Sequence, residues 1–286
     1  MTDTKPILVT GATGRVGRQV VSQLLMEGAR VRALTRNPDA ADLPPEVEVV
    51  RGDLAIPETL TAALENVGAI FLVWTAPIDS AAAVVDLIAR HSERVVLLSA
   101  PHRTPHPFFQ QPNPLAAMYM ELERLIETSG LAWTFVRPGM FAANSLSWWA
   151  PQIRTGDVVR WPYADAPTAP IHERDIAAVA VRALREAGHD GGNYVLTGPE
   201  SLTQAEQVRT IGDVTGRPLR LDELSPEEAR VELGFPTPAI NMLLNAWAAA
   251  IGQPAFVTNI VEEITGTKAR TFREWVLDHV EDFRVG

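Results

Sequence analysis

The first half of the chain alternates short apolar runs with stretches of helical periodicity. The apolar runs are Ile7–Thr10, Arg30–Thr35, Val47–Arg51, Ala69–Trp74, Val95–Ala100 and Trp133–Val136. Such runs, separated by helical patterns, are typical of parallel strands joined by helices. Between the first two runs, Val16, Val20 and Leu24 recur at the spacing of one helix face, which indicates a βαβ unit. We therefore predict an α/β fold with a Rossmann-type, doubly wound parallel sheet.

The second half is less regular. Helical patterns cover Glu173–Glu186, Thr203–Thr215, Pro226–Leu233 and Phe272–Phe283. The apolar run Asn193–Thr197 is expected to be a strand that rejoins the first sheet. We predict a dinucleotide-binding domain over residues 1–145 and a smaller, mainly substrate-binding domain over residues 146–286, with about 165–200 returning to the Rossmann sheet.

Composition narrows the classes of function. The 35 acidic residues exceed the 25 Lys and Arg residues, for a net charge of −10, which disfavours nucleic-acid and anionic-membrane surfaces. Cysteine is absent, which excludes disulfides, thiolate metal sites and cysteine nucleophiles. No zinc-binding helix motif is present, so we expect no metal site. The sequence has neither a signal-peptide pattern nor a long apolar span, so the protein is expected to be cytoplasmic. Its expected partner is a small-molecule substrate.

A glycine-rich turn follows the first predicted strand. Its sequence is Gly11-Ala12-Thr13-Gly14-Arg15-Val16-Gly17, immediately before the first helical pattern. In this context the first glycine permits a tight turn, the second lets a pyrophosphate approach the backbone, and the third allows close packing of helix on strand. We predict that this turn binds a dinucleotide, through Gly11, Thr13, Gly14, Arg15, Val16 and Gly17; the alternative is a turn of purely structural use.

The end of the second strand distinguishes NADPH from NADH. No acidic residue stands there to bind a ribose 2′-hydroxyl; the chain has Arg36 instead, which can pair with a 2′-phosphate, with Arg15 as a second cation. NADPH is therefore the expected cofactor and NADH the less favoured one, unless Arg36 is an ordinary solvated charge. Asp53 and Leu54 follow the third strand and are expected near the adenine, although a capping role for Asp53 is equally compatible.

Four segments resemble the NmrA-like, atypical branch of the short-chain dehydrogenase/reductases. They are the glycine turn, Gly52-Asp53-Leu54, the segment from Ser129 to Phe141, and Ile171-His172-Glu173-Arg174-Asp175-Ile176-Ala177. The resemblance implies a Rossmann domain, a smaller substrate domain, and a cleft at the carboxyl ends of the strands. It also implies that Thr75, Ala76, Ser99 and Pro138 line the nicotinamide half of the cofactor.

The Tyr-x-x-x-Lys pair of conventional members is missing. Alignment with relatives places Leu115 at the tyrosine, Tyr119 at the lysine, and Glu123 at an acid of the family. If Tyr119 is instead the tyrosine, its partner is Glu123, whose charge would raise the phenol pKa. The remaining catalytic candidates are Ser99, which matches the family's carbonyl-polarising serine, and Tyr119. Each has a structural alternative, as a strand-end hydroxyl or as an aromatic residue on a helix face.

Aromatic residues cluster after the sixth strand. We predict that an apolar wall for a flat, bulky ligand is formed by Phe141, Trp148, Trp149 and Trp161. His102 is a further candidate for substrate binding. It lies with His106 in a Pro-rich segment that could be a lid. The alternative for each tryptophan is ordinary core.

These observations predict an NADPH-dependent ketoreductase that transfers hydride to a carbonyl of a bulky aromatic or polyketide substrate. Without the Tyr-Lys pair, a phenol of the substrate could supply the proton. The combination resembles ketoreductases that tailor aromatic polyketide antibiotics of the simocyclinone type. Two alternatives stay open: a quinone or azo reductase, and a redox sensor that binds the dinucleotide without turning it over.

Overall fold

The computed structural model describes residues 5–284, and the chain divides into two units. Unit 1 consists of the residues up to Ala100, Leu115–Pro138 and Glu173–Tyr194. Unit 2 consists of Pro101–Pro114, Gly139–His172 and the residues from Val195 onward. The chain passes into unit 2 three times, after Ala100, after Pro138 and after Tyr194, and returns to unit 1 at Leu115 and at Glu173. The expected assignment of residues 1–145 to cofactor binding and of 146–286 mainly to substrate binding, with about 165–200 returning to the first sheet, stays a prediction.

A seven-stranded sheet in the order β3-β2-β1-β4-β5-β6-β9 is the centre of unit 1. The strands are β1 Ile7–Val9, β2 Val31–Thr35, β3 Glu48–Arg51, β4 Ala69–Val73, β5 Arg94–Leu98, β6 Ala132–Pro138 and β9 Gly192–Leu196. The pairings from β3 to β6 are all parallel. The structure confirms the predicted Rossmann-like α/β fold, and β9 joins the sheet beside β6 as expected.

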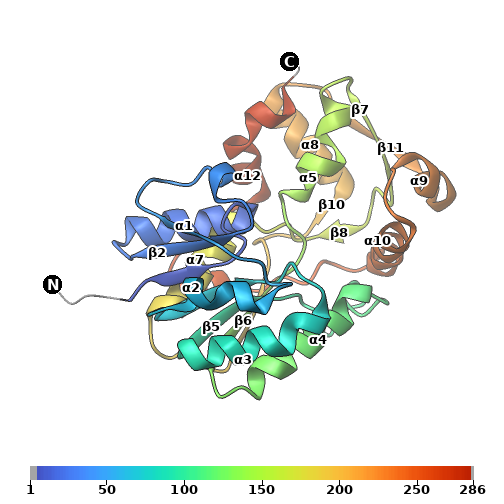
Figure 1. Cartoon of the computed structure of the whole chain (residues 1–286). Helices are drawn as coiled ribbons and strands as arrows, with labels where there is room; N and C mark the ends of the chain where they lie inside the picture. Colours follow the sequence, from blue (N-terminus) through green and yellow to red (C-terminus); the bar gives the residue numbers. More distant parts are fainter. Residues whose placement is uncertain (1–4, 285–286) are drawn as a thin grey trace. The chain divides into compact units, whose positions relative to one another are not determined.

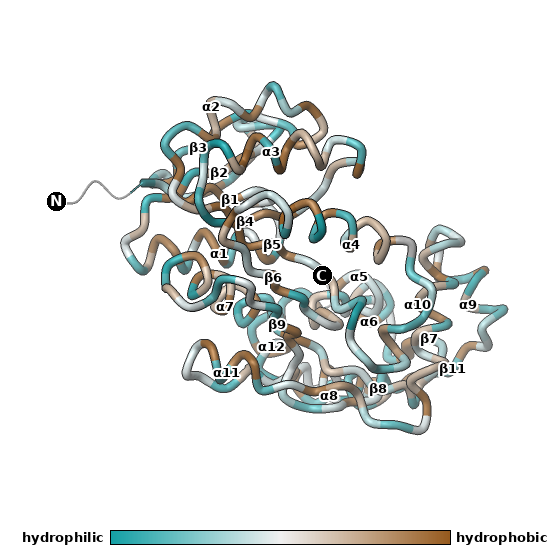
Figure 2. The backbone as a smooth tube through the Cα atoms, turned by 90° about the horizontal axis from the view of Figure 1, so that it is seen from below, coloured by the Kyte–Doolittle hydropathy of each residue, from teal (hydrophilic) through white to brown (hydrophobic). Residues whose placement is uncertain are grey.

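Helices cover both faces of this sheet (Figures 1 and 2). On one face, α1 Arg15–Met26 packs against α7 Glu173–Arg185. The other face carries α2 Thr61–Leu64, α3 Ala81–His91 and α4 Pro114–Glu127. Short 3₁₀ turns lie at Pro38–Ala40, Pro57–Leu60 and Ile78–Ser80.

The core of unit 1 explains why the central strands are apolar throughout. Ile70, Leu72, Val95 and Leu97 are completely buried and belong to one cluster with residues of α3 and α4. Figure 2 shows the hydrophobic stretches of the chain at these strands. Each such side chain contributes roughly 1.5–3 kcal/mol by burial. A strand covered on both faces cannot alternate apolar with polar residues, which is why its sequence reads as an unbroken run.

Unit 2 is built mainly from helices around two small sheets. Its helices are α5 Asn144–Trp148, α6 Ala150–Ile153, α8 Gln204–Thr215, α9 Pro226–Glu232, α10 Thr237–Ala250, α11 Ile260–Thr265, α12 Phe272–Asp278 and the 3₁₀ turn Val280–Phe283. The pair β7 Val158–Pro162 and β11 Arg220–Leu224 is parallel, and the pair β8 Pro167–Thr168 and β10 Leu202–Thr203 is antiparallel.

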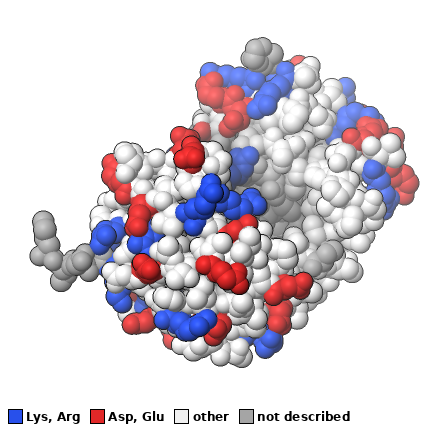
Figure 3. Space-filling view, in the orientation of Figure 1, with Lys and Arg blue, Asp and Glu red and all other residues white. Residues whose placement is uncertain are grey.

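The surface is mixed in charge. Figure 3 shows acidic and basic side chains interspersed on the face in view, without a broad field of one sign. Among the described residues, no helix has both the length and the apolar character needed to cross a membrane.

Candidate functional site

The glycine turn has the geometry of an anion-binding loop. Gly11 has φ +61°, a value that favours glycine, and the backbone N–H of Gly14 donates to the carbonyl of Gly11 at 2.9 Å. A Cβ atom on Gly17 would lie 2.1 Å from the Gly11 carbonyl oxygen, so only glycine permits this approach. Helix α1 begins with Gly14 as N-cap and has no side-chain cap, which leaves its first N–H groups to an anion. The turn therefore fits the pyrophosphate of a dinucleotide.

Two polar residues that the sequence analysis missed hold this turn in place. Thr10 Oγ1 donates to the carbonyl of Val73 and accepts from its N–H at 2.7 Å, which ties the end of β1 to the end of β4. Arg18 donates to the carbonyls of Thr13 and Asp42 at 3.0 and 2.7 Å. The sequence signal for Arg18 was its position one residue after the last glycine of the turn. Its acceptor Asp42 lies in a loop whose position could not be predicted from the sequence.

The two predicted cations lie on different elements: Arg36 follows β2, and Arg15 is the first residue of α1. Both are exposed, and within residues 5–284 neither guanidinium forms a hydrogen bond or an ion pair with the protein. Two uncommitted guanidinium groups fit the charge of a 2′-phosphate.

The adenine-side candidates are less exposed to a ligand. Asp53 Oδ1 accepts from the N–H of Ala55 at 2.9 Å, a local turn that matches the capping alternative. The Leu54 side chain belongs to the core, as does that of Val16, so each offers a cofactor only its backbone.

The expected nicotinamide-side residues follow neighbouring strands. Thr75 and Ala76 come after β4, Ser99 after β5, and Pro138 ends β6. Thr75 is exposed and Ala76 half-buried, whereas Pro138 is buried. Since these strands are parallel and adjacent, the four residues share the carboxyl edge of the sheet, where dinucleotide folds bind their ligands.

A buried polar network occupies this edge. Glu123 on α4 is completely buried and receives two hydrogen bonds from Arg137, Nε to Oε1 at 2.8 Å and Nη2 to Oε2 at 2.7 Å. Ser99 Oγ donates to Glu123 Oε1 at 2.6 Å. The sequence analysis singled out Ser99 and Glu123 but not Arg137, whose position in β6 looks like that of a core residue. In this arrangement the Ser99 proton is already committed to a carboxylate.

Tyr119 lies one helical turn before Glu123 on α4 and is partly buried. Burial raises the pKa of its phenol, so the group is a weaker acid than a free tyrosine. The direction agrees with the expectation, but the cause is desolvation and not the charge of Glu123, which Arg137 neutralises. The structure thus pairs Ser99 with Glu123, and Tyr119 is not part of the network.

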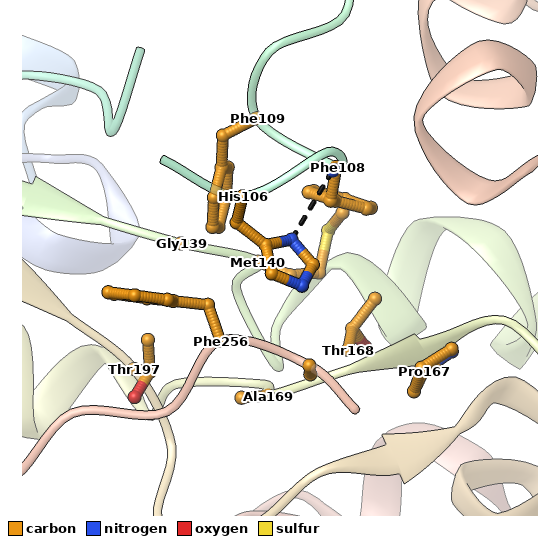
Figure 4. Close-up of a pocket in the computed structure, with 11 residues that line it drawn as sticks. His106, Phe108, Phe109, Gly139, Met140, Pro167, Thr168, Ala169, Thr197 and Phe256 are labelled. Carbon is orange, nitrogen blue, oxygen red and sulfur yellow. Dashed lines mark hydrogen bonds between the residues drawn. The ribbon is translucent and has the colours of Figure 1, made fainter. Parts of the chain in front are cut away.

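Unit 2 contains a small aromatic pocket, which is lined by His106, Phe108, Phe109, Gly139, Met140, Pro167, Thr168, Ala169, Thr197, Ala255 and Phe256. In Figure 4 the ring of His106 lies among the phenylalanines. His106 Nδ1 accepts from the N–H of Phe108 at 3.3 Å, which leaves Nε2 to donate to the carbonyl of Pro254 at 3.1 Å. The enclosed volume is about 10 Å³, room for about one water molecule, so a ligand enters only if these segments separate.

The predicted substrate wall is largely core. Trp149 and Trp161 are each only 1% exposed and pack in the main cluster of unit 2, where their rings meet edge to face. Trp161 also donates from Nε1 to Gln204 at 2.7 Å. Trp148 is half-buried, stacks on Trp161 and lines a separate groove. His102 and Phe141 are half-buried but do not line the aromatic pocket, whose phenylalanines the sequence analysis missed.

Comparisons with known proteins agree with this geometry. A model of the family described as NAD(P)H-binding matches residues 11–187. The (4-alkanoyl-5-oxo-2,5-dihydrofuran-3-yl)methyl phosphate reductase of Streptomyces griseus is 40% identical over 97% of this chain and 99% of its own. The NAD(P)H azoreductase of Xenophilus azovorans is 32% identical over 97% and 99%.

Among solved structures, the NADPH-dependent quinone oxidoreductase QOR2 of Escherichia coli matches with a TM-score of 0.79 at 25% identity, over 96% of this chain and 99% of its own. NmrA also shares the fold. These matches confirm the resemblance on which the expected cofactor and reaction class depend. The chain belongs to the NAD(P)H-binding family and is an NAD(P)H-dependent oxidoreductase.

Proposed function

We propose that this protein is an NADPH-dependent reductase of electron-poor, conjugated acceptors such as quinones and acyl-substituted unsaturated lactones. The observation that carries the proposal is the Ser99 hydroxyl, whose only proton is donated to Glu123. Tyr119 is a poor substitute as an acid, because burial raises the pKa of its phenol. A conjugated acceptor needs no strong protein acid, since its own π system delocalises the charge that reduction creates.

The residues of unit 1 bind and orient the cofactor. The turn from Gly11 to Gly17 would hold the pyrophosphate, and Arg36 with Arg15 would hold the 2′-phosphate. When bound, the reduced nicotinamide supplies a hydride. Reduction of a conjugated acceptor would consume this hydride and a proton from water, with NADP⁺ as the other product. The relatives support this acceptor class, since their names specify an acyl furanone, an azo compound and a quinone.

A ketone of a bulky aromatic or polyketide substrate is the second candidate. The same lack of a protein acid favours it, provided that a phenol next to the carbonyl donates the proton internally. The aromatic pocket of unit 2, with Phe108, Phe109 and Phe256, is chemically suited to a flat ring. Tailoring of an antibiotic would be one setting for such a reaction.

Product analysis separates these candidates. Purified protein is incubated with NADPH that is deuterated at the transferable position, together with one acceptor at a time. The four acceptors are naphthoquinone, an acyl butenolide, a hydroxylated aromatic ketone, and the same ketone without its phenol. We expect oxidation of NADPH with naphthoquinone and with the butenolide, and deuterium on a ring carbon of the reduced butenolide. Turnover of the hydroxylated ketone alone would favour the second candidate. Tight NADPH binding with no turnover of any compound would contradict both and support the redox sensor.

A further inference from the structure

The Ser99 hydroxyl has a fixed polarity. A serine side chain has one proton to donate and two lone pairs that accept. Its proton is donated to Glu123 Oε1 at 2.6 Å, and within residues 5–284 no N–H or O–H group donates to Ser99 Oγ. Toward any ligand at this edge of the sheet, Ser99 is therefore an acceptor.

The ion pair behind Ser99 maintains this polarity. Glu123 is completely buried, and both of its oxygens accept from the Arg137 guanidinium, whose carbon atom also lies 5.6 Å from the ring centre of Phe135. A carboxylate that accepts two hydrogen bonds from one guanidinium has no proton to donate to Ser99. Turning the Ser99 hydroxyl away would remove one of the three hydrogen bonds that this completely buried carboxylate accepts.

The position of Ser99 identifies the group that it would meet. It follows β5, in the half of the sheet formed by β4, β5 and β6, whereas the glycine turn and Arg36 belong to β1 and β2. A dinucleotide that crosses the switch point between β1 and β4 places its nicotinamide half over β4 to β6. The hydrogen-bond donors of that half are the ribose hydroxyls and the carboxamide N–H₂ group, and only the carboxamide is attached to the ring that transfers the hydride.

The geometry points to Ser99 as a positioning residue that accepts a hydrogen bond from the nicotinamide carboxamide, with Glu123 and Arg137 fixing its polarity. Ser99 thus orients the ring for hydride transfer and is not the proton donor. The inference deepens the proposed function and rests on its NADPH binding.

The test compares two nucleotides that differ only at this group. NADPH and its reduced acetylpyridine analogue, whose acetyl group accepts but cannot donate, are titrated into the protein, with binding followed by calorimetry. We expect the wild-type protein to bind NADPH about fivefold or more tightly than the analogue, the effect of one hydrogen bond. In Ser99→Ala this ratio should fall to about one, and Ser99→Thr, which keeps the hydroxyl, should restore most of it.

Ser92→Ala is the matched control. Ser92 is also a buried serine beside β5, but at the amino end of the strand, where it donates to the carbonyls of Gly68 and Arg94. The preference of Ser92→Ala for NADPH over the analogue should equal that of the wild type. A wild-type ratio near one overturns the inference even if Ser99→Ala does not fold, and so does an unchanged ratio in Ser99→Ala. Wild-type protein that binds neither nucleotide contradicts the cofactor assignment itself.

Discussion

Helix α1 can lie close to the glycine turn because Gly17 has no Cβ atom. Gly17→Ala would bring that atom to 2.1 Å from the Gly11 carbonyl oxygen, so the turn must open. We expect Tm to fall by about 3 °C or more, since overpacking costs about 1–3 kcal/mol, and NADPH binding to be lost. Thermal denaturation and titration measure the two effects.

Gly156→Ala is the control for this variant, because a Cβ atom at Gly156 meets nothing within 4 Å. It should leave NADPH binding unchanged. If Gly17→Ala bound NADPH as well as Gly156→Ala does, the glycine turn would not be the pyrophosphate site.

Arg36 is the residue proposed to select the phosphorylated cofactor. Removing its guanidinium in Arg36→Ala should weaken NADPH binding by roughly tenfold to hundredfold, the effect of hydrogen bonds to a charged group, and leave NADH binding within about twofold. Fluorescence titration with each nucleotide gives both constants. Arg90→Ala, which removes an exposed arginine of α3 that pairs with Asp86, should change neither. Equal losses for NADPH and NADH would refute a role for Arg36 at the 2′-phosphate.

Tyr119 is predicted to have no part in proton transfer. Because burial raises its pKa, the phenol stays protonated through neutral pH and gives up its proton less readily than a free tyrosine. Tyr119→Phe should therefore lower kcat by less than about tenfold, whereas loss of a general acid costs about 100-fold or more. Steady-state kinetics with a quinone decide the point. A loss of the larger size would restore Tyr119 as the acid.

At the scale of elements, capping boxes define where several helices of unit 2 begin. Helix α8 begins after Thr203, whose side chain accepts from the N–H of Glu206 while the Glu206 carboxylate accepts from the N–H of Thr203. Equivalent pairs start α9 at Ser225 and α12 at Thr271. The pattern Ser/Thr-x-x-Glu marks all three starts, and the helices expected from Thr203, Pro226 and Phe272 begin within one residue of them.

These caps predict a pH dependence of stability. Hydrogen bonds from the Thr203 backbone and side chain lower the pKa of Glu206, so its stabilisation is present above the ordinary glutamate pKa and is lost as the pH falls through the lowered value. Glu206→Ala should lower Tm by about 1–3 °C at neutral pH, and the deficit should shrink in acid. Scanning calorimetry from neutral to acidic pH follows the change. Glu46→Ala, at an exposed residue that caps no helix, should match the wild type throughout; a deficit independent of pH would argue against the cap.

Helices and strands with a clear pattern of apolar residues were predictable, and those without such a pattern were not. The strands of the large sheet lie within two residues of their expected positions. In the central strands β1, β4 and β5 the reason is burial on both faces, which leaves an unbroken apolar run. Helix α10 was missed, since apolar residues occur around most of its circumference and blur the helical period. Strand β11, which reads Arg-Leu-Asp-Glu-Leu, pairs only with β7 and lacks a strand pattern. The expected helix to Phe283 ends at Asp278 and continues as a 3₁₀ turn.

At the scale of the whole molecule, parts of the site that lie in one stretch of sequence were predictable. Parts that bring together residues from distant stretches were not. The glycine turn and Arg36 are contiguous with strands, so a local pattern locates them. Ser99, Glu123 and Arg137 meet only because β5 and β6 are adjacent and α4 connects them. The aromatic pocket draws on five separate stretches of unit 2. Trp149 and Trp161 belong to the core of unit 2, and a cluster of tryptophans in the sequence looks the same for a core as for a binding wall.

The most direct test of hydride transfer without a protein acid is the pH profile of kcat/KM for naphthoquinone with NADPH. The account predicts oxidation of NADPH that requires the protein and is constant within about twofold from about pH 6 to 8.5, both in the wild type and in Tyr119→Phe, because no group of the protein must deliver a proton. The variant is needed because the raised pKa of Tyr119 keeps its phenol protonated over this whole range, so the wild-type profile alone would not reveal it as the acid. A rate that falls about tenfold per pH unit within this range would reveal a protein acid, and no oxidation above the protein-free background would contradict the proposed reaction.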